Sequence, residues 1–200
     1  KSLQYYKKAR QYADHDFAKI TLENNIAAVY TLSNEPKKAL AILIPLEQRA
    51  KHFKDTKIHT KISNIIGLAY LKLNDARSLD YFLKGLRIRQ AENDHYGLMD
   101  CYAHLANYYK VNRKTIPLAN KYALKSYDEA TQLGVTEERL KALKILATTS
   151  SDEDSNRYLE SYFKLNDSLT SVKQKNKNQF AKIKYDFSEQ MEQNQKLKAQ

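Results

Sequence analysis

Three consecutive segments decide the fold: NIIGLAY at residues 64–70, the polar tripeptide LND at 73–75, and SLDYFLKGL at 78–86. Apolar residues recur at spacings of three and four in both longer segments, which predicts two amphipathic helices joined by a tight turn. In the first helix the small residue Gly67 allows the second helix to approach closely, and Tyr70, about one turn later, fills the space beside it. The second helix repeats the scheme with a small, an aromatic and a small residue: Ser78, Phe82 and Gly85.

The same scheme recurs along the whole chain. Its recurrence has a period of roughly 37 to 41 residues, and equivalent positions at this spacing indicate an internal repeat. The equivalent positions are Ser2, Ala39, Ser78, Ala119 and Asn156. The predicted units are one unpaired helix, then four helical hairpins: 1–14, 17–52, 56–91, 95–133 and 136–163.

This register resembles the tetratricopeptide repeat (TPR), in which the first helix carries a small residue and a tyrosine. The second helix of a TPR carries an alanine, an aromatic residue and another small residue. The resemblance implies an all-α solenoid of helical hairpins with a right-handed superhelical path. The period is longer than the usual TPR length of about 34 residues, so we expect longer helices or wider turns. HEAT-like helix pairs share the period but lack this register, and they rank second.

The composition agrees with an all-α array. With 4 Gly and 3 Pro in 200 residues, turns are few and helices long. Strand-type alternation is absent, and no apolar run reaches the length of about 18 residues that a membrane helix needs. The chain starts and stops within a helical pattern, so we expect it to be a piece of a longer protein.

Charge and motifs argue against catalysis and nucleic-acid binding. The formal net charge is +11, but the lysines are spread along the chain, so we interpret them as a solvated surface and expect no nucleic-acid partner. The single cysteine, Cys101, lies on a packed helix face, and no phosphate loop or nucleophile motif is present. The five histidines lack metal-ligand spacing. We predict no catalytic residue, no metal site and no cofactor for this chain.

The first helices of a TPR array line its concave groove, where peptides bind. By register, seven side chains are candidates for binding a peptide or protein partner there. The asparagines could hold a peptide backbone through amide donor and acceptor, and the lysines could attract a carboxylate; a merely solvated groove is the alternative. The two-lysine, two-asparagine clamp of chaperone-binding TPRs is not reproduced. The candidates are Asn24, Lys61, Asn64, Asn107, Lys110, Lys141 and Lys144.

The C-terminal part reads as one long helix. Residues 135–200 contain no Gly or Pro, and their apolar stripe has steps of three and four with a near-11-residue repeat. We predict a helix from about Asp154 to beyond Gln200, with 164–200 as a connector. Large apolar residues beyond the last repeat need a partner, so we expect a homodimer; a capping helix that folds back is the alternative. The candidate dimer residues are Val172, Phe180, Ile183, Phe187 and Met191.

Two further segments, LNDSL at 165–169 and FAKIKYD at 180–186, are similar to the end of the TPR array in Bacteroidetes-type membrane signalling proteins. In that family an extracytoplasmic array leads through a long helix and a membrane span to a histidine kinase or a DNA-binding output domain. The resemblance implies a periplasmic, non-catalytic sensor region of a two-component-type protein in the inner membrane. The alternative is a soluble TPR adaptor, in the cytoplasm, that binds a peptide or protein in its groove.

Overall fold

The computed structural model describes the backbone of residues 2–112 and 115–198, and their side chains except those of 186 and 190–198. This part of the chain is all-helical, which confirms the predicted class. Nine helices follow one another in these residues: α1 (Ser2–Gln11), α2 (Asp16–Leu32), α3 (Pro36–Ala50), α4 (Thr56–Lys72), α5 (Arg77–Glu92), α6 (His95–Val111), α7 (Ile116–Gln132), α8 (Thr136–Thr149) and α9 (Asp152–Lys198).

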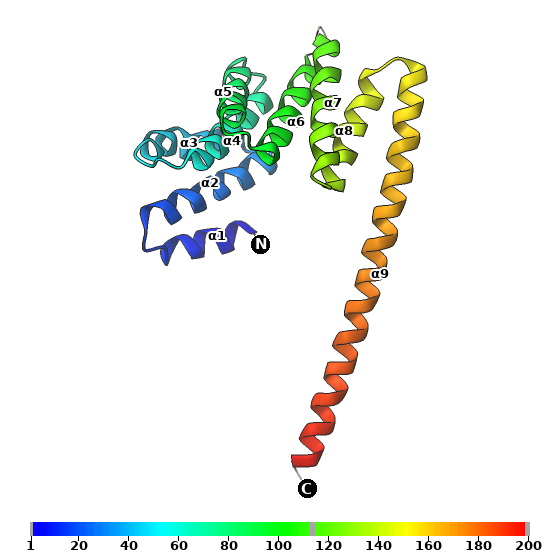
Figure 1. Ribbon diagram of the computed structural model, residues 1–200. Coiled ribbons are helices and arrows are strands. Elements are labelled where there is room, and N and C mark those ends of the chain that lie inside the picture. Colours follow the sequence, from blue (N-terminus) through cyan, green and yellow to red (C-terminus); the bar gives the residue numbers. More distant parts are fainter. Residues whose placement is uncertain (1, 113–114, 199–200) are drawn as a thin grey trace.

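The helices pack in chain order, each against the next (Figure 1). In addition, α2 contacts α4, α4 contacts α6, and α6 contacts α8. Alternate helices therefore form one continuous side of the array, while α3, α5 and α7 lie between them in the sequence. The predicted hairpins correspond to α2–α3, α4–α5, α6–α7 and α8 with the start of α9.

Tight turns between helices rely on residues in the left-handed backbone region. Asn34, Asn74 and Asn93 have φ of 62°, 54° and 51°, and Gly134 has φ of 70°. Asparagine and glycine tolerate this conformation best, and it is a common way to end a helix. The predicted LND turn is confirmed, and Gly134 follows the end of α7 in the same conformation.

A carboxylate side chain caps the N-terminus of α4. Thr56 is the first residue of this helix. The cap is Asp55, whose Oδ1 accepts hydrogen bonds from the backbone N–H groups of Lys57 and Ile58 at 2.8 and 3.4 Å. A carboxylate at this position also interacts favourably with the helix dipole.

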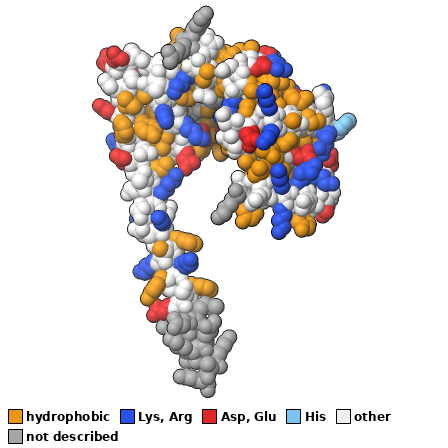
Figure 2. Space-filling view, turned by 180° about the vertical axis from the view of Figure 1, so that it is seen from behind, with side chains coloured by type: hydrophobic (Ala, Val, Ile, Leu, Met, Phe, Trp, Pro, Cys, Tyr) orange, Lys and Arg blue, Asp and Glu red, His pale blue; other side chains and the backbone are white. Residues whose placement is uncertain are grey.

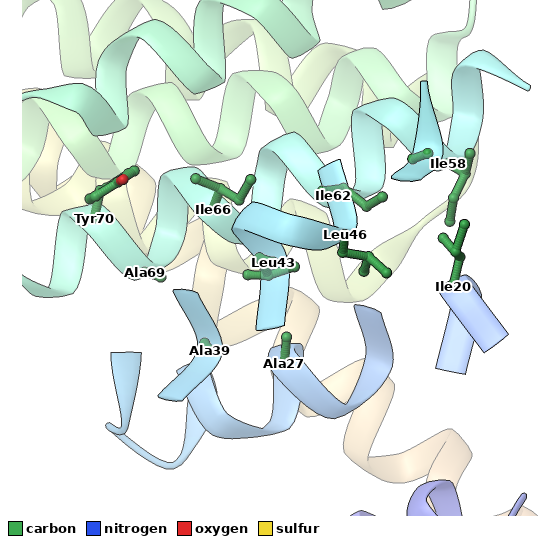
Figure 3. Packing of buried hydrophobic residues seen from close by; sticks show 11 residues of the cluster. Ile20, Ala27, Ala39, Leu43, Leu46, Ile58, Ile62, Ile66, Ala69 and Tyr70 are labelled. Carbon is green, nitrogen blue, oxygen red and sulfur yellow. The ribbon is translucent and has the colours of Figure 1, made fainter. Parts of the chain in front are cut away.

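The core of the first hairpins is built from α2, α3 and α4. Ile20 and Ala27 of α2 point toward Leu43 and Leu46 of α3, and the apolar face of α4 with Ile62 completes the cluster (Figure 3). All five of these side chains are buried. The apolar stripes that predicted amphipathic helices are therefore the faces that meet in the core.

The small and aromatic residues of the central hairpin are in contact, as the pattern predicted. A Cβ atom added to Gly67 would lie 2.6 Å from Cε1 and 2.7 Å from Cδ1 of Phe82. A Cβ atom added to Gly85 would lie 2.8 Å from Oδ1 of Asn64. Phe82 is completely buried. The close approach of α4 and α5 therefore requires glycine at both positions.

The last helix, α9, is a single element of 47 residues, about 70 Å long at a rise of about 1.5 Å per residue. It begins at Asp152, two residues before the predicted start, and continues without a break through the predicted boundary at 163/164. Its contact with α8 extends from Ser155, whose hydroxyl donates to the Ala147 carbonyl at 2.6 Å, to Lys173, which pairs with Glu137 at 2.7 Å. Beyond this point α9 stands clear of the array (Figures 1 and 2).

Candidate interaction surfaces

The predicted groove residues fall into two groups in the structure. Lys61, Asn107, Lys141 and Lys144 are exposed, and Lys110 is half-buried. They are carried by α4, α6 and α8, which contact one another in succession. These helices therefore place cationic and amide side chains on accessible positions of the array.

The other two candidates, Asn24 and Asn64, are buried, with 5% and 8% of their surface exposed. The Oδ1 atoms of both have no hydrogen-bond partner among the described residues. Asn64 lies between helices, because its Oδ1 is the atom closest to a Cβ built on Gly85 of α5. Little of either amide is accessible to a peptide in the groove, and their role in binding stays a prediction.

Most of the exposed candidates are free to meet a partner. Lys61, Lys110 and Lys144 make no side-chain hydrogen bond or ion pair with another described residue, and neither does Asn107. Lys141 instead pairs with Glu138, one turn earlier on α8, with 2.5 Å between Nζ and Oε1. The structure does not join the seven residues into one cluster.

A cluster that sequence reasoning missed lies on α6, between α5 and α8. The ring of His104 stacks on Phe82, with centroids 5.4 Å apart and planes 8° from parallel. Burial lowers the pKa of His104 to about 4, and the charge of Lys141 acts in the same direction. Burial, together with the charge of Glu138, raises the pKa of Asp100. The cluster therefore holds the neutral imidazole of His104 beside the carboxyl group of Asp100, which ionises less readily than an aspartate in water.

Cys101 behaves as the sequence predicted, as a packing residue. It is fully buried, and burial raises the pKa of its thiol to about 11. The thiol is therefore protonated near neutral pH, whereas a nucleophilic cysteine needs its thiolate form.

The second half of α9 presents an apolar face without a partner among the described residues. Phe180 and Phe187 are 70% and 63% exposed, and Val172 and Ile183 are also more than half exposed. The same stripe is partly buried against the array nearer its start, at Tyr158, Tyr162, Leu165 and Leu169. The apolar face thus continues beyond the surface that covers it. Met191 lies outside the described side chains.

Lysines flank this apolar face, a feature that the sequence reasoning overlooked. Residues 168–185 contain five lysines and no acidic residue. Figure 2 shows lysines and hydrophobic side chains together along this half of α9. Within α9, residues 168–185 therefore carry only positive charge, a local exception to the expected even spread of lysines.

No protein-family model matches the chain, and no curated protein matches it at a significant level. Among the described helices, none combines the length and apolar character that crossing a bilayer requires. In the same residues, no group of three or more His, Cys, Asp or Glu side chains is placed to hold a metal ion. Function is therefore inferred from the surfaces themselves.

Proposed function

We propose that this chain is a non-catalytic interaction module built from TPR-like hairpins. In this proposal the side formed by α2, α4, α6 and α8 binds a peptide or protein partner, and α9 joins two copies of the chain. In the full-length protein the module is the extracytoplasmic sensor region of a two-component-type signalling protein. The observation that carries the proposal is the uncovered apolar face of α9, with Phe180, Ile183 and Phe187 beyond the end of α8.

The helix contacts support the TPR-like part of the proposal. In TPR arrays each first helix contacts the first helix of the next hairpin, and α2, α4, α6 and α8 make contacts of this kind. The exposed lysines of this side suit a partner that carries carboxylates, because each meets a counter-charge without losing an existing ion pair, Lys141 excepted. Partner binding would shift the packing of the array, and α9 would transmit the shift to a dimeric output domain.

The magnitudes favour a dimer of moderate strength. Covering the exposed surface of the four apolar side chains on each of two helices is worth on the order of 8–12 kcal/mol. Association costs about 4–15 kcal/mol in lost translational and rotational freedom. The two free energies are similar in size, so the dimer should dissociate on dilution. The lysines of the two helices repel each other by a few tenths of a kcal/mol per pair, and salt screens this repulsion. The dimer should therefore tighten as the salt concentration rises.

The decisive test is the solution mass of the chain, measured by light scattering over a range of protein and salt concentrations. We expect the parent to be a dimer that dissociates on dilution, and the Phe180→Glu, Phe187→Glu double variant to be a folded monomer. The matched control is Leu32→Glu, which places the same charge on another exposed apolar residue, 80% exposed on α2. This control should keep the mass of the parent.

Two results would overturn the dimer. One is a parent that stays monomeric at every concentration with the same helix content as the double variant. The other is equal loss of mass in the double variant and in Leu32→Glu. In either case α9 is not a dimerising connector, and a soluble adaptor that binds a peptide through α4, α6 and α8 becomes the better proposal.

A further inference from the structure

A cleft is lined by side chains of three successive helices, α7, α8 and α9. Its volume is about 340 Å³, within the range of small-molecule sites in proteins. The lining combines two cationic side chains, three hydroxyl groups and two leucines. These residues are Tyr127 of α7, Arg139 and Leu143 of α8, and Ser161, Lys164, Leu165 and Ser168 of α9.

The cleft contains an arginine without a counter-charge. The guanidinium of Arg139 lies 5.5 Å from the centre of the Tyr127 ring, and its NH2 group donates to the Tyr127 hydroxyl at 3.4 Å. Its Nε atom is buried and has no hydrogen-bond partner, and no described carboxylate pairs with it. A partly buried cation without an anion is costly to maintain.

Other arginines of the chain pair with carboxylates. Arg49 donates to Asp16 and to Glu23, at 2.6 and 2.7 Å. Arg89, which is more deeply buried, pairs with the Asp94 carboxylate. Exposed Arg49 and buried Arg89 thus both have carboxylate partners, whereas no described carboxylate pairs with Arg139.

The carboxylates beside Arg139 in the sequence are already engaged. Glu137 pairs with Lys173 of α9 at 2.7 Å, and Glu138 pairs with Lys141 at 2.5 Å. Neither is available to neutralise the guanidinium without breaking its own ion pair. No described carboxylate therefore neutralises the positive charge of Arg139, and this charge lies in the lining of the cleft.

The remaining polar groups of the cleft are suited to an oxyanion. Lys164 makes no ion pair with a described residue, and Ser168 makes no side-chain hydrogen bond to one. The Tyr127 hydroxyl accepts from Arg139, so its own proton is available. Ser161 donates to the Arg157 carbonyl at 2.9 Å. Donors thus predominate in the cleft, and charge-assisted hydrogen bonds from such donors bind carboxylate and phosphate groups.

We propose that this cleft binds a small molecule that carries a carboxylate or phosphate group. The oxyanion lies against Arg139, Lys164 and Ser168, and the apolar part of the molecule lies against Leu143 and Leu165. Such a ligand bridges α8 and α9 at the point where α9 leaves the array, and so stabilises their packing. The site goes beyond the proposed function, because it needs neither a dimer nor a peptide partner.

The test is thermal unfolding with two probes, inorganic phosphate and succinate, each compared with chloride at equal ionic strength. We expect either probe, or both, to raise the unfolding temperature of the parent, as preferential binding to the folded state requires. Exposed Lys164 is the safest residue to change, and Lys164→Gln should bind the effective probe about ten-fold more weakly. Arg139→Gln should abolish the shift.

The matched control is Arg157→Gln, which removes an exposed arginine of α9 whose partner is Asp154. It should keep the shift of the parent. If neither probe shifts the parent, or if Lys164→Gln and Arg157→Gln respond equally, the anions merely screen the net charge and the site is refuted. Hydrogen exchange gives a second readout: the probe should slow exchange in 161–168, also in the Phe180→Glu, Phe187→Glu background, which separates this site from the dimer.

Discussion

The Phe82→Ala variant should lose about 3–5 kcal/mol of its free energy of unfolding, the cost of removing a buried aromatic side chain. Phe82 is fully buried between α4 and α6, where it contacts Gly67 and stacks on His104. Gly67→Ala should also destabilise the fold, because its Cβ would lie 2.6 Å from the ring. Overpacking of this kind costs about 1–3 kcal/mol, and the higher helix propensity of alanine offsets part of it.

A double-mutant cycle separates this contact from other effects of the two substitutions. Once Phe82 is reduced to alanine, the added methyl group at Gly67 has room, so the second substitution should be neutral or stabilising. Urea unfolding followed by circular dichroism measures each variant. Phe163→Ala, at a ring 58% exposed on α9, is the matched control and should cost less than about 1 kcal/mol. Equal cost of Gly67→Ala in both backgrounds would refute the contact.

The part of the fold that could be predicted from the sequence depends on contacts within one hairpin. Gly67 and Phe82 are 15 residues apart and meet because a short turn brings two helices side by side. Helical spacing alone identifies the apolar faces, and the long stretch without Gly or Pro identifies α9. These local signals suffice for the helices and their order.

The surfaces were harder to predict because they depend on how hairpins pack against one another. The register placed Asn64 and Lys61 on the same groove, yet the structure buries Asn64 against α5 and leaves Lys61 exposed. Helical periodicity assigns a face within one helix, but the angle between neighbouring helices decides how far each residue is covered. The cleft around Arg139 requires three helices, and its one sequence signal was an arginine in the first turn of a helix, where a carboxylate is favoured.

Acid should destabilise this fold through His104. The pKa of His104 in the folded state is about 4 because of burial, whereas a histidine in the unfolded chain has a pKa near 6.5. The unfolded state therefore binds the proton first as the pH falls. The contribution of neutral His104 to the free energy of unfolding is complete above about pH 6.5, declines between about 6.5 and 4, and is lost below that range. The shift corresponds to about 3 kcal/mol, measured by urea unfolding as a function of pH.

The His104→Phe variant isolates this contribution. Phenylalanine keeps a ring against Phe82 and removes Nδ1, which is buried without a hydrogen-bond partner, so the variant should fold and should lose less stability in acid than the parent. His52→Phe, at an exposed histidine, is the matched control and should keep the profile of the parent. An unchanged acid profile in His104→Phe would contradict the burial of a neutral imidazole.

Asp100 contributes to the same profile with the opposite sign. Its pKa is raised in the folded state, mainly by burial and further by Glu138, so the folded state takes up this proton more readily than the unfolded chain. Protonation of Asp100 therefore stabilises the fold as the pH falls, and partly conceals the loss at His104. In Asp100→Asn this compensation is absent, and the acid-induced loss of stability should be steeper than in the parent. A shallower profile in Asp100→Asn would mean that the carboxylate, and not the imidazole, controls the response of the α6–α8 contact to acid.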